Sequence, residues 1–298
     1  MNIVKKTLTA ALVCALVPLA ACGKGEIKDD QAPSAGASSA PAAGAGSAPA
    51  AKAEGGDKAA AGEKAAPAAG DAAGFDFAKY DALLKKYVTE RGKVDYKGLK
   101  GDDAAMGDLK DAAKRVGTAD ISKMGRDAKL SFYINAYNVL TLKAVIDRYP
   151  IKSVMDVKNP DFFKGIKHKV AGEEMTLDVL ENERIRGAEF GEARIHFVVN
   201  CASASCPRLR RDAITPANLE KELEAGAREY VLQETKVDAA KKVVDTSQIF
   251  NWFAADFKKS SGTVNDFLAK YMDSAQADTI KASTLTFHDY DWALNESK

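Results

Sequence analysis

The chain has 298 residues and a formal net charge of +1 at pH 7. Proteins that bind nucleic acids use a strong positive charge to contact the phosphate backbone, and a net charge of +1 gives no sign of one. We therefore expect no nucleic acid as a partner. The length suffices for one sizeable domain with its own core.

The first 21 residues have the pattern of a secretory signal peptide. Two lysines precede a mostly apolar run that Pro18 interrupts, and small residues follow it. The apolar run is shorter than the roughly 18 residues of a membrane-spanning helix. Leu19, Ala20, Ala21 and Cys22 resemble a bacterial lipobox. This resemblance implies cleavage before Cys22 and acylation of that residue, with palmitate among the acyl groups, so the expected partner is a membrane reached through the lipid.

Residues 22–73 combine the lipidated Cys22 with a segment of Ala, Gly, Pro and Ser. Such a segment buries too little apolar surface to offset the entropy of ordering it, which predicts a disordered tether. Gly23 stands where an aspartate would favour the inner membrane in enteric bacteria, so the outer membrane of the cell envelope is favoured. Residues 74–298 have the mixed composition of one globular domain.

Apolar periodicity predicts several helices in this domain. Helical spacing begins at Phe77, and Gly92 is a candidate stop after this first helix. The strongest helical pattern covers residues 125–150, which Pro150 closes. Further helices are predicted after Thr176 as N-cap, and after Thr215 as N-cap with Pro216 in the first position.

Strands are shorter and scattered. We predict two around Gly172, a buried one over residues 193–201, one that opens residues 242–257 ahead of an aromatic helix, and one within residues 284–295. Helices therefore outweigh strands without regular alternation. This predicts the α+β class, a helix-rich domain with a small, mainly antiparallel sheet. Trp252 and Trp292 are expected to be core anchors.

Two asparagines interrupt the apolar pattern of the long helix. Asn135 and Asn138 are three residues apart and project on the same side. Buried amides need hydrogen-bond partners, so they either bridge neighbouring backbone or line a site.

Several segments together resemble one family. "FYINAYNVLTLKAV", "IHFVVNCASASCPRL", "IFNWFAADF" and "YDWALN" follow in the order found in the domain family of unknown function DUF547. The resemblance implies a fold and recurring positions without an assigned chemistry. Those positions are Asn135, Tyr137, Asn138, Glu181, Arg186, His196, Asn200, Cys201, Ser203, Cys206 and Pro207. Many members have a histidine after the glutamate, whereas this chain has Asn182.

The segment with Cys201 and Cys206 admits three kinds of chemistry. In an oxidising compartment the two thiols can form a disulfide that shapes the loop between them. Alternatively, one of them is a reactive thiol or both are a redox pair. Cys206 is the better candidate nucleophile, because a helix starting at Pro207 and nearby arginines would lower its pKa. Metal binding is disfavoured, because two cysteines and His196 are a weak ligand set, and no cofactor is expected.

A thiol nucleophile also needs a base. In an extended strand His196 and Cys201 would lie roughly 16 Å apart on opposite faces, which argues against a local dyad. His168 is expected to face solvent and His288 to pack on an aromatic ring. Glu181 and Arg186 belong either to a solvated helix face or to a buried site.

Two functions remain open. The favoured one is a membrane-tethered binding or scaffolding domain, with an envelope protein or a small molecule as its ligand. The alternative is a thiol-dependent hydrolase or acyl-transfer enzyme that uses Cys206 or Cys201, with Asn135, Asn138 or Asn200 polarising a carbonyl, or a redox-active cysteine pair.

Overall fold

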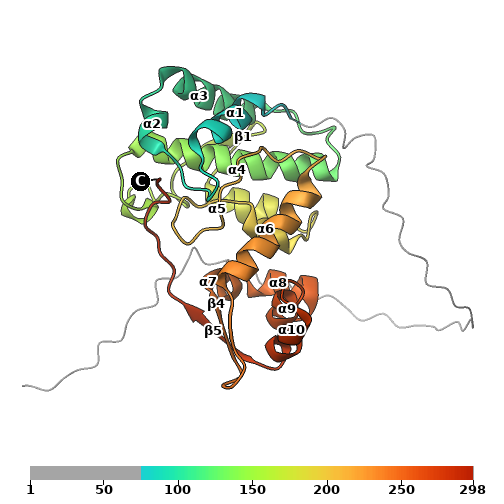
Figure 1. Cartoon of the computed structure of the whole chain (residues 1–298). Helices are drawn as coiled ribbons and strands as arrows, with labels where there is room; N and C mark the ends of the chain where they lie inside the picture. Colours follow the sequence, from blue (N-terminus) through green and yellow to red (C-terminus); the bar gives the residue numbers. More distant parts are fainter. Residues whose placement is uncertain (1–74, 298) are drawn as a thin grey trace, which may run out of the picture. The chain divides into compact units, whose positions relative to one another are not determined.

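The computed structural model describes residues 75–297. The predicted signal peptide, Cys22 and the predicted tether fall outside these residues. Within the described part, no helix is long and apolar enough to cross a membrane. Helices dominate and two small sheets accompany them (Figure 1), which confirms the predicted α+β class.

Four helices form the first part of the domain. They are α1 (Ala78–Tyr87), α2 (Tyr96–Lys100), α3 (Asp103–Thr118) and α4 (Arg126–Arg148). Helix α4 is buried along almost its whole length, as expected of a helix that is apolar on most sides. The N-cap carboxylate of Asp102 accepts a hydrogen bond from Ala105 N and fixes the start of α3, which packs against α1 and α4.

A short hairpin covers the end of α3. Strands β1 (His168–Val170) and β2 (Glu173–Met175) pair antiparallel around Gly172. Backbone bonds from Ala171 N to Val116 O (2.9 Å) and from Gly172 N to Gly117 O (2.8 Å) attach this hairpin to α3. Thr176 then caps α5 (Leu177–Val179), as predicted, and α5 continues directly into one turn of π-helix, η2 (Leu180–Ile185).

The second part is built on α6. Its elements are α6 (Leu219–Glu234), β3 (Lys236–Asp238), β4 (Val243–Ser247), α7 (Gln248–Trp252), α8 (Ala254–Ser261), α9 (Val264–Ala269), α10 (Ser274–Lys281) and β5 (Thr284–His288). Strand β4 pairs antiparallel with β3 and parallel with β5. Two of the three strand pairings in the described residues are antiparallel, as predicted, but the strands form two small sheets rather than one.

The C-terminal segment connects the two parts. After β5 the chain runs back past α5 toward α2 (Figure 1). Leu294 N bonds to Lys152 O, near η1 (Val154–Asp156), and Ser297 N bonds to Val94 O. Between these two bonds, Asn295 N donates to Ala202 O at 3.1 Å. The loop that carries the cysteines is therefore held by the last residues of the chain.

The segment before the cysteines is not the predicted strand. Ala193–Phe197 form a 3-10 helix, η3, whose N-cap Glu192 accepts a hydrogen bond from Arg194 N. Phe197 packs in one hydrophobic cluster with α6, while Val198 belongs to the other cluster with α4. A short apolar run that is buried on all sides has no strand periodicity to distinguish it from a helical turn.

Three predicted helix boundaries are also wrong. Helix α1 ends at Tyr87, and Gly92 lies in the following turn with φ 72°. Helix α6 begins at Leu219, because Thr215 and Asn218 close a separate turn before it. No helix starts at Pro207, since the chain has no helical residue between it and α6.

We expect Asn135→Ala to destabilise the fold. The buried Asn135 amide donates to Ile214 O (2.5 Å) and accepts from Ile214 N (3.0 Å), so its removal leaves two buried backbone groups without partners. The free energy of unfolding should fall by about 2–4 kcal/mol. Urea unfolding measures this, with the exposed Asn251→Ala as the control. Equal midpoints for the two variants would contradict the assigned role.

Candidate functional site

The cysteine loop is shaped by two buried asparagines. Asn138, on α4, donates to Val198 O (2.9 Å) and accepts from Asn200 N (2.8 Å). Asn200 in turn donates to Pro207 O (2.8 Å) and accepts from Ala202 N (3.0 Å). The entry and exit of the loop are thus tied to each other and to the long helix. Asn135 contacts Ile214 instead and lies outside the thiol centre.

A second set of buried polar groups continues from Asn200 to the C-terminus. Asn295 donates to Asn200 Oδ1 at 3.2 Å and accepts from the hydroxyl of Tyr96 at 2.6 Å. Ala202 has a left-handed backbone, φ 61°, which a residue with a Cβ adopts only when its surroundings impose it. This turn directs Ser203 back toward Cys201.

Cys201 is surrounded by hydrogen-bond donors. Its Sγ lies 3.1 Å from Ser203 Oγ and 3.3 Å from Tyr290 Oη. Ser203 Oγ and Tyr290 Oη also lie 3.1 Å from each other, so the two hydroxyls form one cluster at the sulfur. Burial opposes ionisation, but hydrogen bonds from Cys206, Ser203 and Tyr290 outweigh it and lower the pKa of Cys201 to about 7.

Cys206 is the protonated partner of this pair. Burial and the hydrogen bond that it gives to Cys201 raise the pKa of its thiol well above 9. Its Sγ accepts a hydrogen bond from Cys201 N at 3.0 Å. The sequence predicted a lowered pKa for Cys206, and this is wrong, because no helix begins at Pro207. Both cysteines are free thiols in the structure, so the predicted disulfide is not present in this state.

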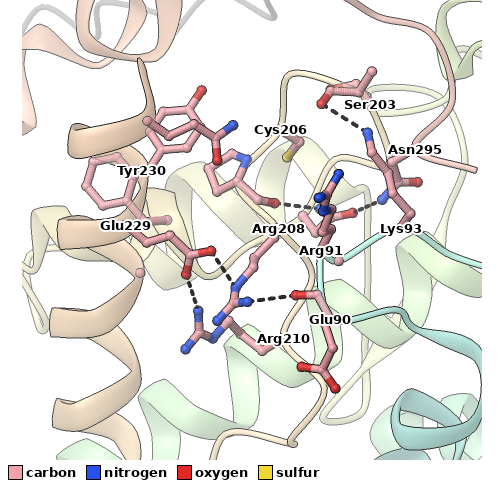
Figure 2. Close-up of a pocket in the computed structure, with 17 residues that line it drawn as sticks. Glu90, Arg91, Lys93, Ser203, Cys206, Arg208, Arg210, Glu229, Tyr230 and Asn295 are labelled. Carbon is pink, nitrogen blue, oxygen red and sulfur yellow. Dashed lines mark hydrogen bonds and ion pairs between the residues drawn. The ribbon is translucent and has the colours of Figure 1, made fainter. Parts of the chain in front are cut away.

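A cavity of about 450 Å³ opens beside Cys206 (Figure 2). Ser203, Asn200 and Asn295 form the wall near the thiol. Across the cavity from Ser203 and Asn295 lie Tyr230 and Glu229 of α6. The Tyr230 hydroxyl donates to Ser205 O at 2.9 Å and lies 2.8 Å from Ser247 Oγ, which joins the cysteine loop to α6 and the end of β4.

Charged side chains line the remaining wall of this cavity. Arg210 is held by Glu222 (2.7 Å) and Glu229 (3.0 Å), and Arg208 lies 2.8 Å from Glu229. Arg91 and Lys93 come from the turn between α1 and α2. Arg208 and Arg210 thus belong to ion pairs with α6.

A second polar cluster includes Glu181 in the π-helix. Burial raises the pKa of Glu181 to about 7, although a hydrogen bond from Tyr137 and the charge of Arg186 oppose this rise. Burial also raises the pKa of Tyr137, and the charges of Glu181 and of both thiols add to it. Tyr137 therefore interacts electrostatically with both Glu181 and the thiol pair.

Arg186 and His196 share one carboxylate. Arg186 Nε and His196 Nε2 lie 2.7 Å and 2.8 Å from Asp256 Oδ2. Burial lowers the pKa of His196, whose ring stacks on Phe253. Asn182, which stands where many DUF547 members have histidine, hydrogen-bonds to Arg186. These contacts make a structural ion-pair group rather than a base for Cys201.

The other two histidines have different surroundings from those predicted. His168 is half-buried, and burial together with Lys143 and Arg148 lowers its pKa to about 4, so the prediction of a solvent-facing side chain is wrong. His288 lies 3.0 Å from both Asp245 and Glu234. Among residues 75–297, no group of three or more His, Cys, Asp or Glu side chains is arranged to hold a metal ion.

Tyr290, Tyr230 and Asn295 were missed as site residues by sequence reasoning. Tyr290 and Asn295 are the ends of the "YDWALN" segment, so its resemblance to the family was a usable signal. Trp252 and Trp292, predicted as core anchors, are half-buried and stack on each other at 6.0 Å, with Tyr290 against both. They form an aromatic flank next to the thiol centre.

Residues 121–231 match the model of a family described as "Protein of unknown function, DUF547". The match supports the resemblance for α4, the cysteine loop and most of α6. The segments "IFNWFAADF" and "YDWALN" lie beyond it. Comparisons with curated proteins and with solved structures found no match.

We expect the thiol pair to lose its first proton near neutral pH. The rate at which iodoacetamide alkylates the pair should rise with pH through a midpoint of about 7. Tyr290→Phe removes a donor to the thiolate and should raise this midpoint by about one pH unit or more. Tyr271→Phe, whose hydroxyl contacts Glu224, is the control. A midpoint near that of a free thiol in the unchanged protein would disprove the assignment.

Proposed function

We propose that this protein is a lipid-anchored protein of the cell envelope whose domain carries out thiol–disulfide exchange at Cys201 and Cys206. The observation that carries the proposal is the position of Cys206 Sγ, 3.0 Å from Cys201 N, together with the unequal acidity of the two thiols: the pKa of Cys201 is about 7 and that of Cys206 is raised. Exchange reactions need a thiolate at ambient pH and a second thiol within bonding reach. The dithiol of the structure is the reduced state of this pair.

The geometry gives the two sulfurs different roles. Cys206 faces the cavity, whereas Cys201 is not among the lining residues. A substrate in the cavity therefore meets Cys206, and Cys201 lies beside Cys206 as a stabilised thiolate. When an incoming thiolate attacks Cys206 in the oxidised pair, Cys201 is the leaving group, and a thiol of low pKa leaves fastest.

Oxidation of the pair by a small disulfide runs in the opposite direction. Cys206 Sγ bonds to one substrate sulfur, its proton passes to Cys201 Sγ, and the other substrate sulfur leaves as a thiolate. Cys201 then gives the proton to this thiolate and bonds to Cys206 Sγ, which releases the second substrate sulfur as a thiolate. One disulfide is reduced and one is formed, so electrons and protons balance.

The hydrolase or acyl-transfer alternative has less support. It needs a base that reaches the nucleophile. His196 is bound to Asp256, His288 contacts Asp245 and Glu234, and His168 is surrounded by Lys143 and Arg148. A dithiol needs no histidine, because the second sulfur accepts the proton.

The pair should form an intramolecular disulfide in glutathione redox buffers. Intact mass would record the loss of two hydrogens, and Cys201→Ser should stop at a mixed disulfide on Cys206. Because the hydrogen bond from Tyr290 stabilises only the reduced form, Tyr290→Phe should shift the equilibrium toward the disulfide about tenfold. Failure to form the intramolecular disulfide at any buffer ratio would overturn the proposal.

The proposed anchor rests on the lipobox resemblance of Leu19–Cys22 and on the short apolar run before it. In a bacterial host fed alkyne-palmitate, the full chain should become labelled, and Cys22→Ser should abolish the label. Cys14→Ser is the matched control, because Cys14 lies inside the apolar run that cleavage removes. Labelling that survives Cys22→Ser would refute the anchor.

A further inference from the structure

We propose that the cavity beside Cys206 binds an anionic, low-molecular-weight thiol or disulfide, and that Arg91 and Lys93 hold its carboxylates. This inference rests on the proposed thiol–disulfide exchange and names the substrate class of the same site. Its basis is the charge of the cavity, the fixed position of the two cations and the size of the space.

The cavity has an excess of positive charge. Four cationic side chains and two carboxylates line it: Arg91, Lys93, Arg208, Arg210, Glu90 and Glu229. Both carboxylates are already engaged, Glu90 by Arg211 and Glu229 by Arg208 and Arg210. Carboxylates of a ligand would neutralise the remaining positive charge.

Of the four cations that line the cavity, Arg91 and Lys93 have no carboxylate partner in the described part of the chain. Arg91 is exposed and makes no ion pair there, and Lys93 donates only to Ala204 O at 3.4 Å. Both lie on the same side of the cavity as Ser203 and Asn295 (Figure 2). Lys93 is partly enclosed and therefore attracts anions more strongly than a cation in bulk water, because solvent screens it less, and the exposed Arg91 adds a second positive charge beside it.

The turn that carries these cations is fixed against the cysteine segment. Gly92 has φ 72°, and a Cβ at this position would lie 2.4 Å from Arg208 Cβ. The Arg208 guanidinium donates to Glu90 O at 2.8 Å, which fastens the same turn. The backbone of the turn therefore has a set position relative to Cys206, and the binding site does not depend on loop closure.

The space limits the ligand to a small molecule. A volume of about 450 Å³ lies in the usual range for small-molecule sites, about 300–1,000 Å³. A ligand sulfur at Cys206 with carboxylates at Arg91 and Lys93 would occupy this space. A thiolate that leaves during exchange would remain near these cations, which stabilise its charge.

Three small disulfides of different charge test the inference with the full chain. The probes are glutathione disulfide, which is anionic, cystamine, which is cationic, and bis(2-hydroxyethyl) disulfide, which is neutral. At low ionic strength, oxidation of the pair by glutathione disulfide should be about tenfold faster than by cystamine, each rate being scaled to that with a model thiol. Added salt should reduce this preference.

Arg91→Ala with Lys93→Ala should abolish the charge preference, whereas Arg91→Lys should preserve it. Lys97→Ala with Lys110→Ala removes the same charge from exposed positions outside the cavity and should leave the preference unchanged. Equal scaled rates for the anionic and cationic probes, or a preference that survives the Arg91 and Lys93 changes, would overturn the inference. In that case, oxidation of the pair by the neutral probe would show that the proposed thiol–disulfide exchange still takes place. If none of the three probes oxidised the pair, the proposed exchange would be rejected as well.

Discussion

The amide of Asn138 is the constraint on which the rest of the site depends. Placed on the buried helix α4, it holds Val198 O and Asn200 N at once, and these residues open the cysteine loop. The Asn200 side chain in turn accepts a hydrogen bond from Ala202 N and donates one to Pro207 O, so it holds the loop at both of these residues. Buried amides without partners are costly, so this network has few alternative arrangements. The loop conformation is thus determined by the core of the domain.

That fixed loop explains the unequal ionisation of the two thiols. Burial alone would raise both pKa values, as it does for Cys206. Cys201 differs because the left-handed turn at Ala202 brings Ser203 back to its sulfur, and the C-terminal segment brings Tyr290. The difference between the two thiols therefore comes from hydrogen-bond geometry, with residues far apart in sequence supplying the donors.

Local patterns predicted the long helix, the hairpin at Gly172, the cap at Thr176 and β5, because each of these depends mainly on nearby residues. The 3-10 helix at residues 193–197 could not be predicted, since its apolar run is buried on all sides. The sequence also singled out the two cysteines and Asn200. It could not assign their chemistry, because Tyr290 reaches Cys201 from 89 residues away.

The donors around Cys201 also bear on the direction of exchange. They stabilise a thiolate, which exists only when the pair is reduced, and they have no equivalent charge to stabilise in the disulfide. A reduced form stabilised in this way makes the corresponding disulfide a stronger oxidant. The proposed pair should therefore accept electrons from thiols more readily than a structural disulfide would. The excess positive charge beside Cys206 acts in the same sense, because it favours the approach of the thiolates that reduce the pair.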